Sequence, residues 1–208
     1  RIVYQNLARI NKAVKENTLG KEKVLLDTFK YAKENNKKVH LLGLVSDGGV
    51  HSHINHLVAL CEYADAYGIE KIRIHCFMDG RDCAPKSGKG FIEKLQKSIH
   101  SSNAEIASII GRYFAMDRDK RWERISKAYH LLTAGKGTAC ADPIEAIEQA
   151  YTNGETDEFI EPISIVDANK QEKGLVQEGD AVVCFNFRTD RCREITEVLT
   201  QRDKHDYN

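Results

Sequence analysis

Several features of membrane, nucleic-acid-binding and disulfide-rich proteins are missing from this sequence of 208 residues. No apolar run approaches the ~20 residues needed to cross a bilayer, and no signal-peptide pattern opens the chain. The 31 Lys and Arg residues are balanced by 31 Asp and Glu residues. The chain therefore lacks the excess basic charge on which nucleic-acid affinity largely rests. We expect a cytoplasmic protein that binds neither a membrane nor nucleic acid.

The cysteines and glycines also fail to form familiar motifs. The six cysteines include no CxxC pair, and several lie in apolar stretches such as IRIHCFM and AVVCFNF. We expect reduced thiols, most of them in the core, in place of a disulfide framework. Neither GxGxxG nor GxxxxGK[ST] occurs, so nucleotide-binding motifs are missing. The chain starts at Arg1 and has methionine only at Met78 and Met116, so we expect it to be a piece of a larger protein.

What is present is an alternation of apolar patterns that predicts an α/β fold. Helical spacing recurs over residues 3–17, 21–36, 54–68, 89–100, 121–135, 143–154 and 190–202, and strand-like runs occupy 38–45, 71–78, 104–111, 159–166 and 181–187. The order predicts one domain with a layered sheet, flanking helices, largely βαβ units and mixed strand directions. Pro162 favours an edge position for the strand at 159–166.

Charged residues follow four of these strands, where the chain leaves the predicted sheet. Ligands of open α/β sheets bind beyond the carboxyl ends of the strands, so these residues are expected to share one edge. Guanidinium groups grip carboxylates and phosphates through paired, charge-assisted hydrogen bonds. The sequence therefore predicts an anion site from Asp47, His51, Asp79, Arg81, Asp82, Arg112, Arg118, Arg188 and Arg191.

Two parts of this set suggest specific roles. Arg188 and Arg191 are three residues apart at the start of a predicted helix, so they can converge on one ligand near its backbone N–H groups. Asp82 lies beside Arg81, where nearby cations favour its carboxylate form. That carboxylate can act as a general base towards a bound hydroxyl. It can equally serve to neutralise and orient the arginines, and the residues alone favour neither role.

The stretch SDGGVHSHINH at residues 46–56 raises the question of a metal site. His53 and His56 could lie on adjacent helix faces and suit zinc. The Gly-Gly turn suits an anion better, the surroundings are rich in arginine, and no fourth ligand is spaced to complete a metal site. We assign His51 to the ligand, His53 to the helix N-cap region, and His56 to packing or solvent. No metal ligand is predicted.

The motifs SDGGVHSH, MDGRD, GRYFAMDRDKRW and NFRTDR, in this order and spacing, resemble the cofactor-independent (2,3-bisphosphoglycerate-independent) phosphoglycerate mutases. The opening VYQNLARIN resembles the segment that leads into an inserted domain of that family. The resemblance implies that residues 1–208 are this inserted, glycerate-binding domain, with a lead-in helix over residues 1–16. It also implies that substrate is held by His51, Arg81, Asp82, Arg112, Arg118, Arg188 and Arg191, with Asp82 as the catalytic candidate.

The resemblance further implies a second, phosphatase-like domain that this chain lacks. In the family, that domain carries the serine nucleophile and two manganese or magnesium ions, and the reaction interconverts 3-phosphoglycerate and 2-phosphoglycerate. This chain is then expected to hold no cofactor of its own and to be inactive alone. One alternative is a non-catalytic module that senses a phosphorylated carboxylic acid. Another is a metal-dependent hydrolase built on Asp47, His51, His53 and His56.

Overall fold

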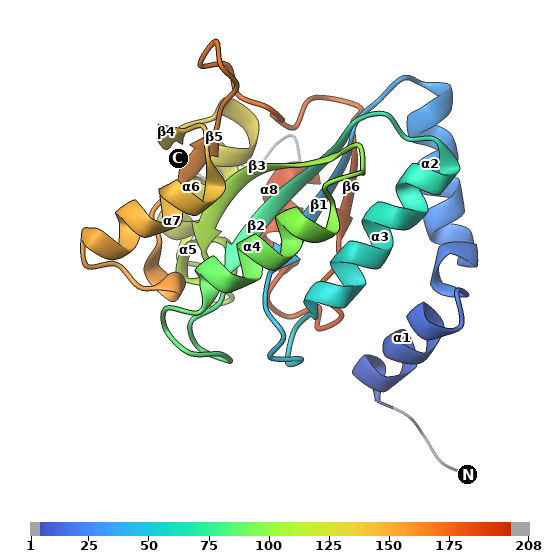
Figure 1. The fold of residues 1–208 in the computed structure, drawn as a ribbon, viewed down its shortest axis with the longest axis horizontal. Helices are drawn as coiled ribbons and strands as arrows, with labels where there is room; N and C mark the ends of the chain where they lie inside the picture. Colours follow the sequence, from blue (N-terminus) through green and yellow to red (C-terminus); the bar gives the residue numbers. More distant parts are fainter. Residues whose placement is uncertain (1–4, 201–208) are drawn as a thin grey trace.

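The structure is a computed structural model that describes residues 5–200 (Figure 1). The first half of the chain forms α1 (Asn6–Lys15), the 3-10 turn η1 (Leu19–Lys21), α2 (Lys23–Glu34), β1 (Val39–Leu44), α3 (Ile54–Tyr67), β2 (Ile72–Met78), α4 (Gly88–Ser98) and β3 (Ala104–Gly111). The second half forms α5 (Arg112–Ala115), α6 (Trp122–Ala134), β4 (Thr138–Cys140), α7 (Pro143–Thr152), η2 (Asp157–Phe159), β5 (Ile163–Ile165), β6 (Ala181–Cys184) and α8 (Arg193–Thr200).

The six strands form one sheet in the order β4-β5-β3-β2-β1-β6. β6, β1, β2 and β3 run parallel, whereas β5 pairs antiparallel with β3 and parallel with β4. The predicted α/β fold with a mixed sheet is confirmed. Helices cover both faces of the sheet, as expected for parallel strands joined by helical crossovers.

Local signals place most helix ends where the sequence predicted them. Gly68 and Gly135 adopt the left-handed conformation that ends α3 and α6, because glycine enters this region without steric cost. The Asp142 carboxylate accepts hydrogen bonds from the backbone N–H groups of Ile144 and Glu145, and Pro143 occupies the first turn of α7. Both features are typical of helix starts.

Two sequence predictions about the second half of the chain are wrong in detail, and one strand was not predicted. Pro162 does not mark an edge strand, because β5 begins after it and lies between β3 and β4. The edge is formed by β4, a strand of three residues that was not predicted because its short TAC sequence carries no alternation. α8 begins at Arg193, so Arg188 and Arg191 lie in the turn before the helix. The predicted helix ends at 3–4 and 201–202 fall outside the described residues.

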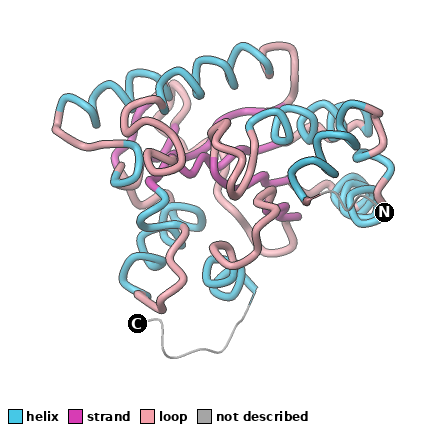
Figure 2. Tube along the Cα trace, turned by 90° about the horizontal axis from the view of Figure 1, so that it is seen from below, coloured by secondary structure: helices cyan, strands magenta, loops and turns pink. Residues whose placement is uncertain are grey.

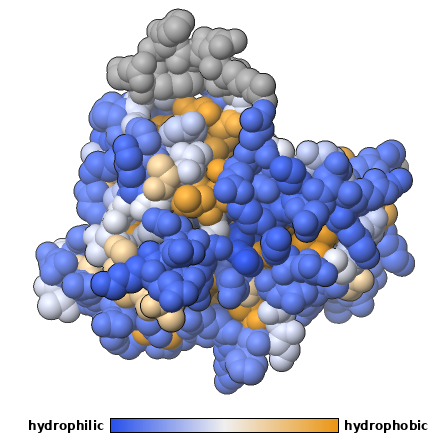
Figure 3. All heavy atoms as spheres, turned by 90° about the horizontal axis from the view of Figure 1, so that it is seen from above, coloured by the Kyte–Doolittle hydropathy of each residue, from blue (hydrophilic) through white to orange (hydrophobic). Residues whose placement is uncertain are grey.

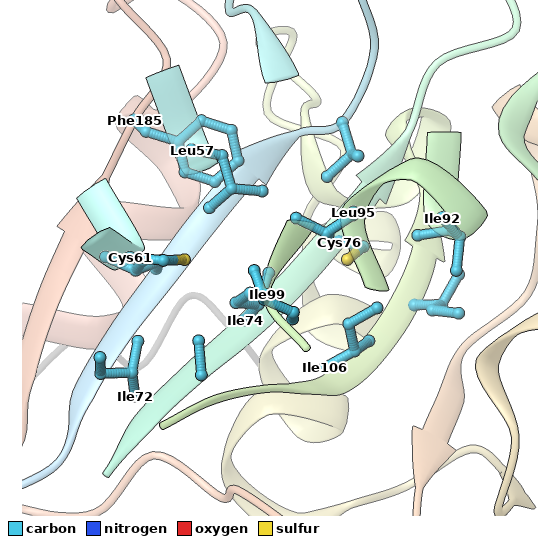
Figure 4. Packing of buried hydrophobic residues seen from close by; sticks show 14 of the residues in the cluster. Leu57, Cys61, Ile72, Ile74, Cys76, Ile92, Leu95, Ile99, Ile106 and Phe185 are labelled. Atoms are coloured by element: carbon cyan, nitrogen blue, oxygen red, sulfur yellow. The ribbon is translucent and has the colours of Figure 1, made fainter. Parts of the chain in front are cut away.

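The core consists of two apolar layers, one on each face of the sheet. Side chains of α2, α3, α4 and α7 pack on one face, where Leu57, Ile74 and Leu95 meet (Figure 4). Side chains of α5, α6 and α8 pack on the other face against Leu42, Leu44 and Phe77 of the central strands. Because both faces are covered, the parallel strands are rigid supports for the loops at their ends.

The carboxyl ends of the parallel strands point to the lower side of the molecule in Figure 1, and Figure 2 views the protein from that side. The opposite side, seen in Figure 3, is largely hydrophilic, with apolar atoms gathered in hollows between the elements. None of the helices within residues 5–200 combines the length and the apolar character that a membrane span requires.

Candidate functional site

Four loops at the carboxyl ends of neighbouring parallel strands carry all seven predicted site residues. The loops follow β1, β2, β3 and β6 and span residues 45–53, 79–87, 112–121 and 185–192, the third of which begins with the short helix α5. We call the seven side chains the anion cluster: His51, Arg81, Asp82, Arg112, Arg118, Arg188 and Arg191. The β1, β2, β3 and β6 strands are adjacent in the sheet, so these four loops meet at one edge.

A buried ion-pair network forms the floor of the anion cluster. Nη1 of Arg112 lies 2.7 Å from Oδ1 of Asp79 and 2.6 Å from Oδ2 of Asp82. Nε2 of His51 lies 3.9 Å from the same Asp82 oxygen. The Arg112 and His51 side chains are each 5% exposed, and the Asp82 side chain is 17% exposed. A charge this deeply buried is held by its partners, so Arg112 has a fixed position.

Asp79 organises this floor from directly after β2. Its Oδ2 accepts a hydrogen bond from the Ser46 hydroxyl, while Oδ1 accepts from the backbone N–H groups of Arg81 and Asp82 as well as from Arg112. Burial alone would raise the pKa of Asp79, but the hydrogen bonds from Ser46, from the Asp82 backbone and from Arg112 hold it below its usual value. Asp79 therefore stays an anion and links the loops after β1, β2 and β3.

A more exposed rim of arginines surrounds the floor. Arg118 and Arg188, each with a side chain 48% exposed, approach the carboxylate of Asp190 at 3.1 Å and 3.5 Å. Arg191 donates a hydrogen bond to the carbonyl oxygen of Met116. Arg81 is 61% exposed and lies 3.7 Å from Glu158. Ion pairs this exposed are weak, so Arg81, Arg118 and Arg188 are free to rearrange around a ligand, whereas Arg191 is partly buried.

Electrostatic effects show that the members of the anion cluster face one another. Burial lowers the pKa of Arg191, and the charges of Arg118, Arg112 and Arg81 lower it further. Burial also lowers the pKa of His51, as does the Arg112 charge, against the opposing effect of Asp82. Like charges held this close favour an anionic ligand between them.

Hydrogen bonding within the cluster is incomplete. Nδ1 of His51, Nε of Arg191 and Oδ1 of Asp190 are buried and have no hydrogen-bond partner within residues 5–200. Buried polar atoms without partners cost free energy, so a ligand that bonds to these atoms would stabilise the cluster.

Glycines allow the loops to approach this closely. A side chain at Gly48 would meet Cβ of Asp82 at 3.0 Å, so glycine lets the loop after β1 lie against the loop after β2. Gly80 has a positive φ of 63°, and a side chain there would meet the backbone nitrogen of Glu158 at 2.7 Å. Any larger residue at Gly80 would be strained and would push the MDGRD turn away from η2.

The remaining polar residues of the 46–56 stretch lie away from the cluster. His53 is the N-cap of α3, where its Nδ1 accepts a hydrogen bond from the backbone N–H of Asn55. His56 is buried and bonds through Nε2 to Asn11 of α1 at 2.7 Å. Both assignments are confirmed, whereas Asp47 is exposed and contacts Cys83 instead of the arginines.

Sequence reasoning left two important carboxylates out of the predicted substrate-binding set. Asp79 was placed at the right edge, and its position directly after a strand is the signal for its organising role. Asp190 lies between Arg188 and Arg191 in NFRTDR, and a carboxylate within an arginine motif is the signal that was overlooked. Both carboxylates hold arginine side chains in place. This role is visible in the structure, but the sequence motifs do not indicate it.

Comparison with known proteins agrees with this architecture. The family model described as BPG-independent PGAM N-terminus matches residues 10–208. The chain belongs to this family. It is 56% identical over 208 residues to a 2,3-bisphosphoglycerate-independent phosphoglycerate mutase of Flavobacterium johnsoniae, covering 100% of this chain and 41% of that protein. The corresponding enzyme of Listeria welshimeri is 47% identical, with 98% of this chain and 40% of that protein covered.

A solved structure of another family member has the same fold. The crystal structure of Leishmania mexicana phosphoglycerate mutase at low cobalt concentration matches with a TM-score of 0.92 at 30% identity. The match covers 99% of this chain and 39% of that one. This chain thus spans about two fifths of the length of these relatives.

Proposed function

We propose that this chain is the glycerate-holding domain of a phosphoglycerate mutase that interconverts 3-phosphoglycerate and 2-phosphoglycerate in glycolysis and gluconeogenesis. The observation that carries the proposal is the meeting of five arginines, His51 and Asp82 at the carboxyl edge of four adjacent parallel strands. A small polyanion with a carboxylate, a phosphate and a hydroxyl matches this number of charge-assisted donors. The names of the relatives point to the same substrate.

In this proposal the floor and the rim of the anion cluster have different tasks. Arg112 is already paired with Asp79 and Asp82, so it supplies a fixed positive charge against the substrate carboxylate. Arg118, Arg188 and Arg191 fold onto the ligand from the rim and fix the carboxylate and hydroxyl groups. Asp82 moves protons to and from the two hydroxyls, or else only orients Arg112 and His51. Holding the glycerate prevents its loss between two phosphoryl transfers.

The phosphoryl transfer itself belongs, in this proposal, to a phosphatase-like partner domain into which this domain is inserted. A serine of that domain takes the phosphoryl group and returns it to the other hydroxyl of the retained glycerate. Among residues 5–200, no three His, Cys, Asp or Glu side chains lie together in a way that could hold a metal ion. In this proposal the manganese or magnesium ions belong to the partner domain, and the enzyme is cytoplasmic. The isolated chain is expected to show no mutase activity.

Ligand titration of the isolated chain tests the substrate assignment. NMR signals of the arginine Nε–H groups would be followed with 3-phosphoglycerate, D-glycerate and glycerol 3-phosphate. We expect the first two ligands to shift the cluster signals and glycerol 3-phosphate, which lacks the carboxylate, to leave Arg112 unchanged. Arg73 is a matched control, because it pairs with Glu105 near the opposite ends of the strands. Equal shifts at Arg73 and at the cluster arginines would contradict a specific site.

A full-length protein containing this domain separates the enzyme from a non-catalytic binding module. We expect mutase activity from the full-length protein, loss of that activity when Arg112 is replaced, and none from the isolated chain. Binding of phosphoglycerate without turnover by the full-length protein would favour the binding module. Appreciable turnover by the isolated chain would refute the division of labour between the domains.

A further inference from the structure

Two cysteines at the back of the arginine turn form a thiol pair. Cys184 ends β6, and Cys192 directly follows Arg191 in the turn before α8. The two side chains pack in the same apolar layer and line one surface groove, and each thiol shifts the pKa of the other. The Cys192 thiol lowers the pKa of Cys184, while the Cys184 thiol and burial raise the pKa of Cys192. Of the two thiols, Cys184 is therefore the one that ionises more readily.

The pair is accessible from one side and connected to the anion cluster on the other. Both cysteines line a surface groove between β6 and α8, where Cys184 is only partly buried. On the inner side, Nδ2 of Asn186 lies 3.1 Å from Sγ of Cys192. Oδ1 of Asn186 accepts a hydrogen bond from the backbone N–H of Leu44 at the end of β1. Asn186 therefore links the Cys192 sulfur to the end of β1, where the loop that carries His51 begins.

The other cysteines lack this combination. Cys61 and Cys76 are buried in the core between the sheet and α3, and burial raises the pKa of each thiol. Cys83 faces the carboxylate of Asp47, and desolvation raises its pKa. Reactivity of a thiol follows thiolate character and access, so the pair at 184 and 192 stands apart.

We propose that Cys184 and Cys192 form a reversible disulfide that switches the arginine turn between two geometries. The oxidant is a hydroperoxide such as hydrogen peroxide. The Cys184 thiolate attacks one peroxide oxygen, the O–O bond breaks, and the leaving hydroxide takes a proton to become water. Cys184 is then a sulfenic acid. The Cys192 sulfur attacks the sulfenic sulfur, its proton leaves with the hydroxyl as a second water, and the S–S bond forms.

Formation of this bond must alter the turn that carries Arg188 and Arg191. Disulfide sulfurs lie about 2 Å apart, closer than any hydrogen-bonded pair, so Cys192 is drawn towards β6. Movement of Cys192 strains its contact with Asn186 and displaces its neighbour Arg191, whose Nη1 bonds to the carbonyl of Met116. The disulfide is therefore expected to weaken ligand binding by the rim. This last consequence rests on the proposed function, whereas disulfide formation does not.

Peptide mapping after peroxide treatment tests the bond. The chain would be oxidised, its remaining thiols alkylated, and the digest analysed by mass spectrometry with and without dithiothreitol. We expect a reducible link between the peptides of Cys184 and Cys192. Cys192→Ser should abolish the link and let a sulfenic acid accumulate at Cys184, trapped by dimedone. Cys140→Ser, at a partly exposed thiol of β4, is the matched control and should leave the link intact.

Two readouts separate failure of the switch from failure of the proposed function. Backbone amide signals of residues 186–192 should move on oxidation and return on reduction, with or without a ligand. Affinity for 3-phosphoglycerate should fall at least about tenfold on oxidation, the loss of one charge-assisted contact. Both thiols remaining alkylatable, or unmoved amide signals, would overturn the switch. A reduced protein that binds no phosphoglycerate but forms the link would overturn only the substrate assignment.

Discussion

The parallel sheet carries two polar networks, one inside it and one at its carboxyl edge, that differ in the completeness of their hydrogen bonding. Within the sheet, a buried ladder crosses β1, β2 and β3. His40 bonds to Asp180 through Nε2 and to His75 through Nδ1, and Nδ1 of His75 bonds to the Ser108 hydroxyl. Every ring nitrogen of the ladder has a partner. At the carboxyl ends, buried atoms of His51 and Arg191 in the anion cluster, and of Asp190 beside it, have no partner within residues 5–200.

This difference is the one expected between a structural network and the proposed binding site. The ladder residues are almost fully buried, and because no donor or acceptor is left over, the ladder has nothing to offer a ligand. The anion cluster combines a fixed, buried floor with half-exposed arginines whose charges repel one another. Such an arrangement costs free energy in the unliganded protein and is relieved by an anion.

The largest expected effect comes from Arg112→Met. This change leaves Asp79 and Asp82 without their buried counter-charge, which costs about 3–5 kcal/mol. We expect a strongly lowered free energy of unfolding in urea and no detectable binding of 3-phosphoglycerate.

A second substitution separates the loss of stability from the loss of ligand binding in Arg112→Met. The double variant Arg112→Met with Asp79→Asn removes one of the stranded charges, so it should regain part of the stability while remaining unable to bind. Full recovery of both properties would show that Arg112 has only a structural role. An unchanged stability of the single variant would contradict the buried ion pair.

A smaller effect, on acid stability, is expected at the ladder. Burial lowers the pKa of His40 to about 4, against the opposing effect of Asp180, and holds the pKa of His75 well below its usual value. Between pH 6.5 and 4 the unfolded chain therefore binds protons that the folded chain excludes, so stability falls as the pH falls. For His40 alone the loss amounts to about 3 kcal/mol. Urea unfolding at a series of pH values measures it.

Substitution of the ladder gives the matched comparison. His40→Gln cannot take up a proton, so its stability should depend less on pH in this window, although it is less stable at neutral pH. His100→Gln alters an exposed histidine and should reproduce the pH dependence of the wild type. A slope for His40→Gln parallel to that of the wild type would place the acid-sensitive group elsewhere.

The two networks also differ in how far the sequence predicted them. The anion cluster was accessible from sequence because its residues follow strands directly, and strand ends of a parallel sheet share one edge. The ladder was missed because His40 and His75 lie inside apolar strands, where a single histidine carries no signal about its partners. Their pairing depends on the register between β1 and β2, which the sequence does not state.

Sequence also predicted features with local signals better than features that depend on tertiary packing, both among the helices and strands and among the residues that hold the arginines in place. Helix ends marked by Gly68, Gly135 and Asp142 were predicted because their signals are local. β4 and the interior position of β5 were not, since a three-residue strand and its neighbours are chosen by tertiary packing. Asp79 and Asp190 act on arginines from other loops, so their roles emerged only when the four loops were seen together.

A third prediction concerns the rim and should change function without changing stability. In a full-length protein with this domain, Arg188→Lys replaces a planar fork with a point charge and should lower kcat/KM by about tenfold or more. Its exposed ion pair with Asp190 contributes little to folding, so the free energy of unfolding should stay within about 0.5 kcal/mol. An unchanged kcat/KM would remove Arg188 from the clamp.

The smallest expected effect is at Arg81, the most exposed arginine of the cluster, and it sets the outer limit of the site. Its side chain is 61% exposed and pairs with Glu158 at 3.7 Å, so Arg81→Gln should change stability by less than about 0.5 kcal/mol. If Arg81 reaches the ligand only through solvent, screening limits the loss of affinity for 3-phosphoglycerate to about threefold. Glu158→Gln is the matched control, since it releases Arg81 without removing its charge. A loss at Arg81→Gln as large as that at Arg188→Lys would move Arg81 from the periphery into the clamp. The boundary between the fixed floor and the mobile rim would then have to be redrawn.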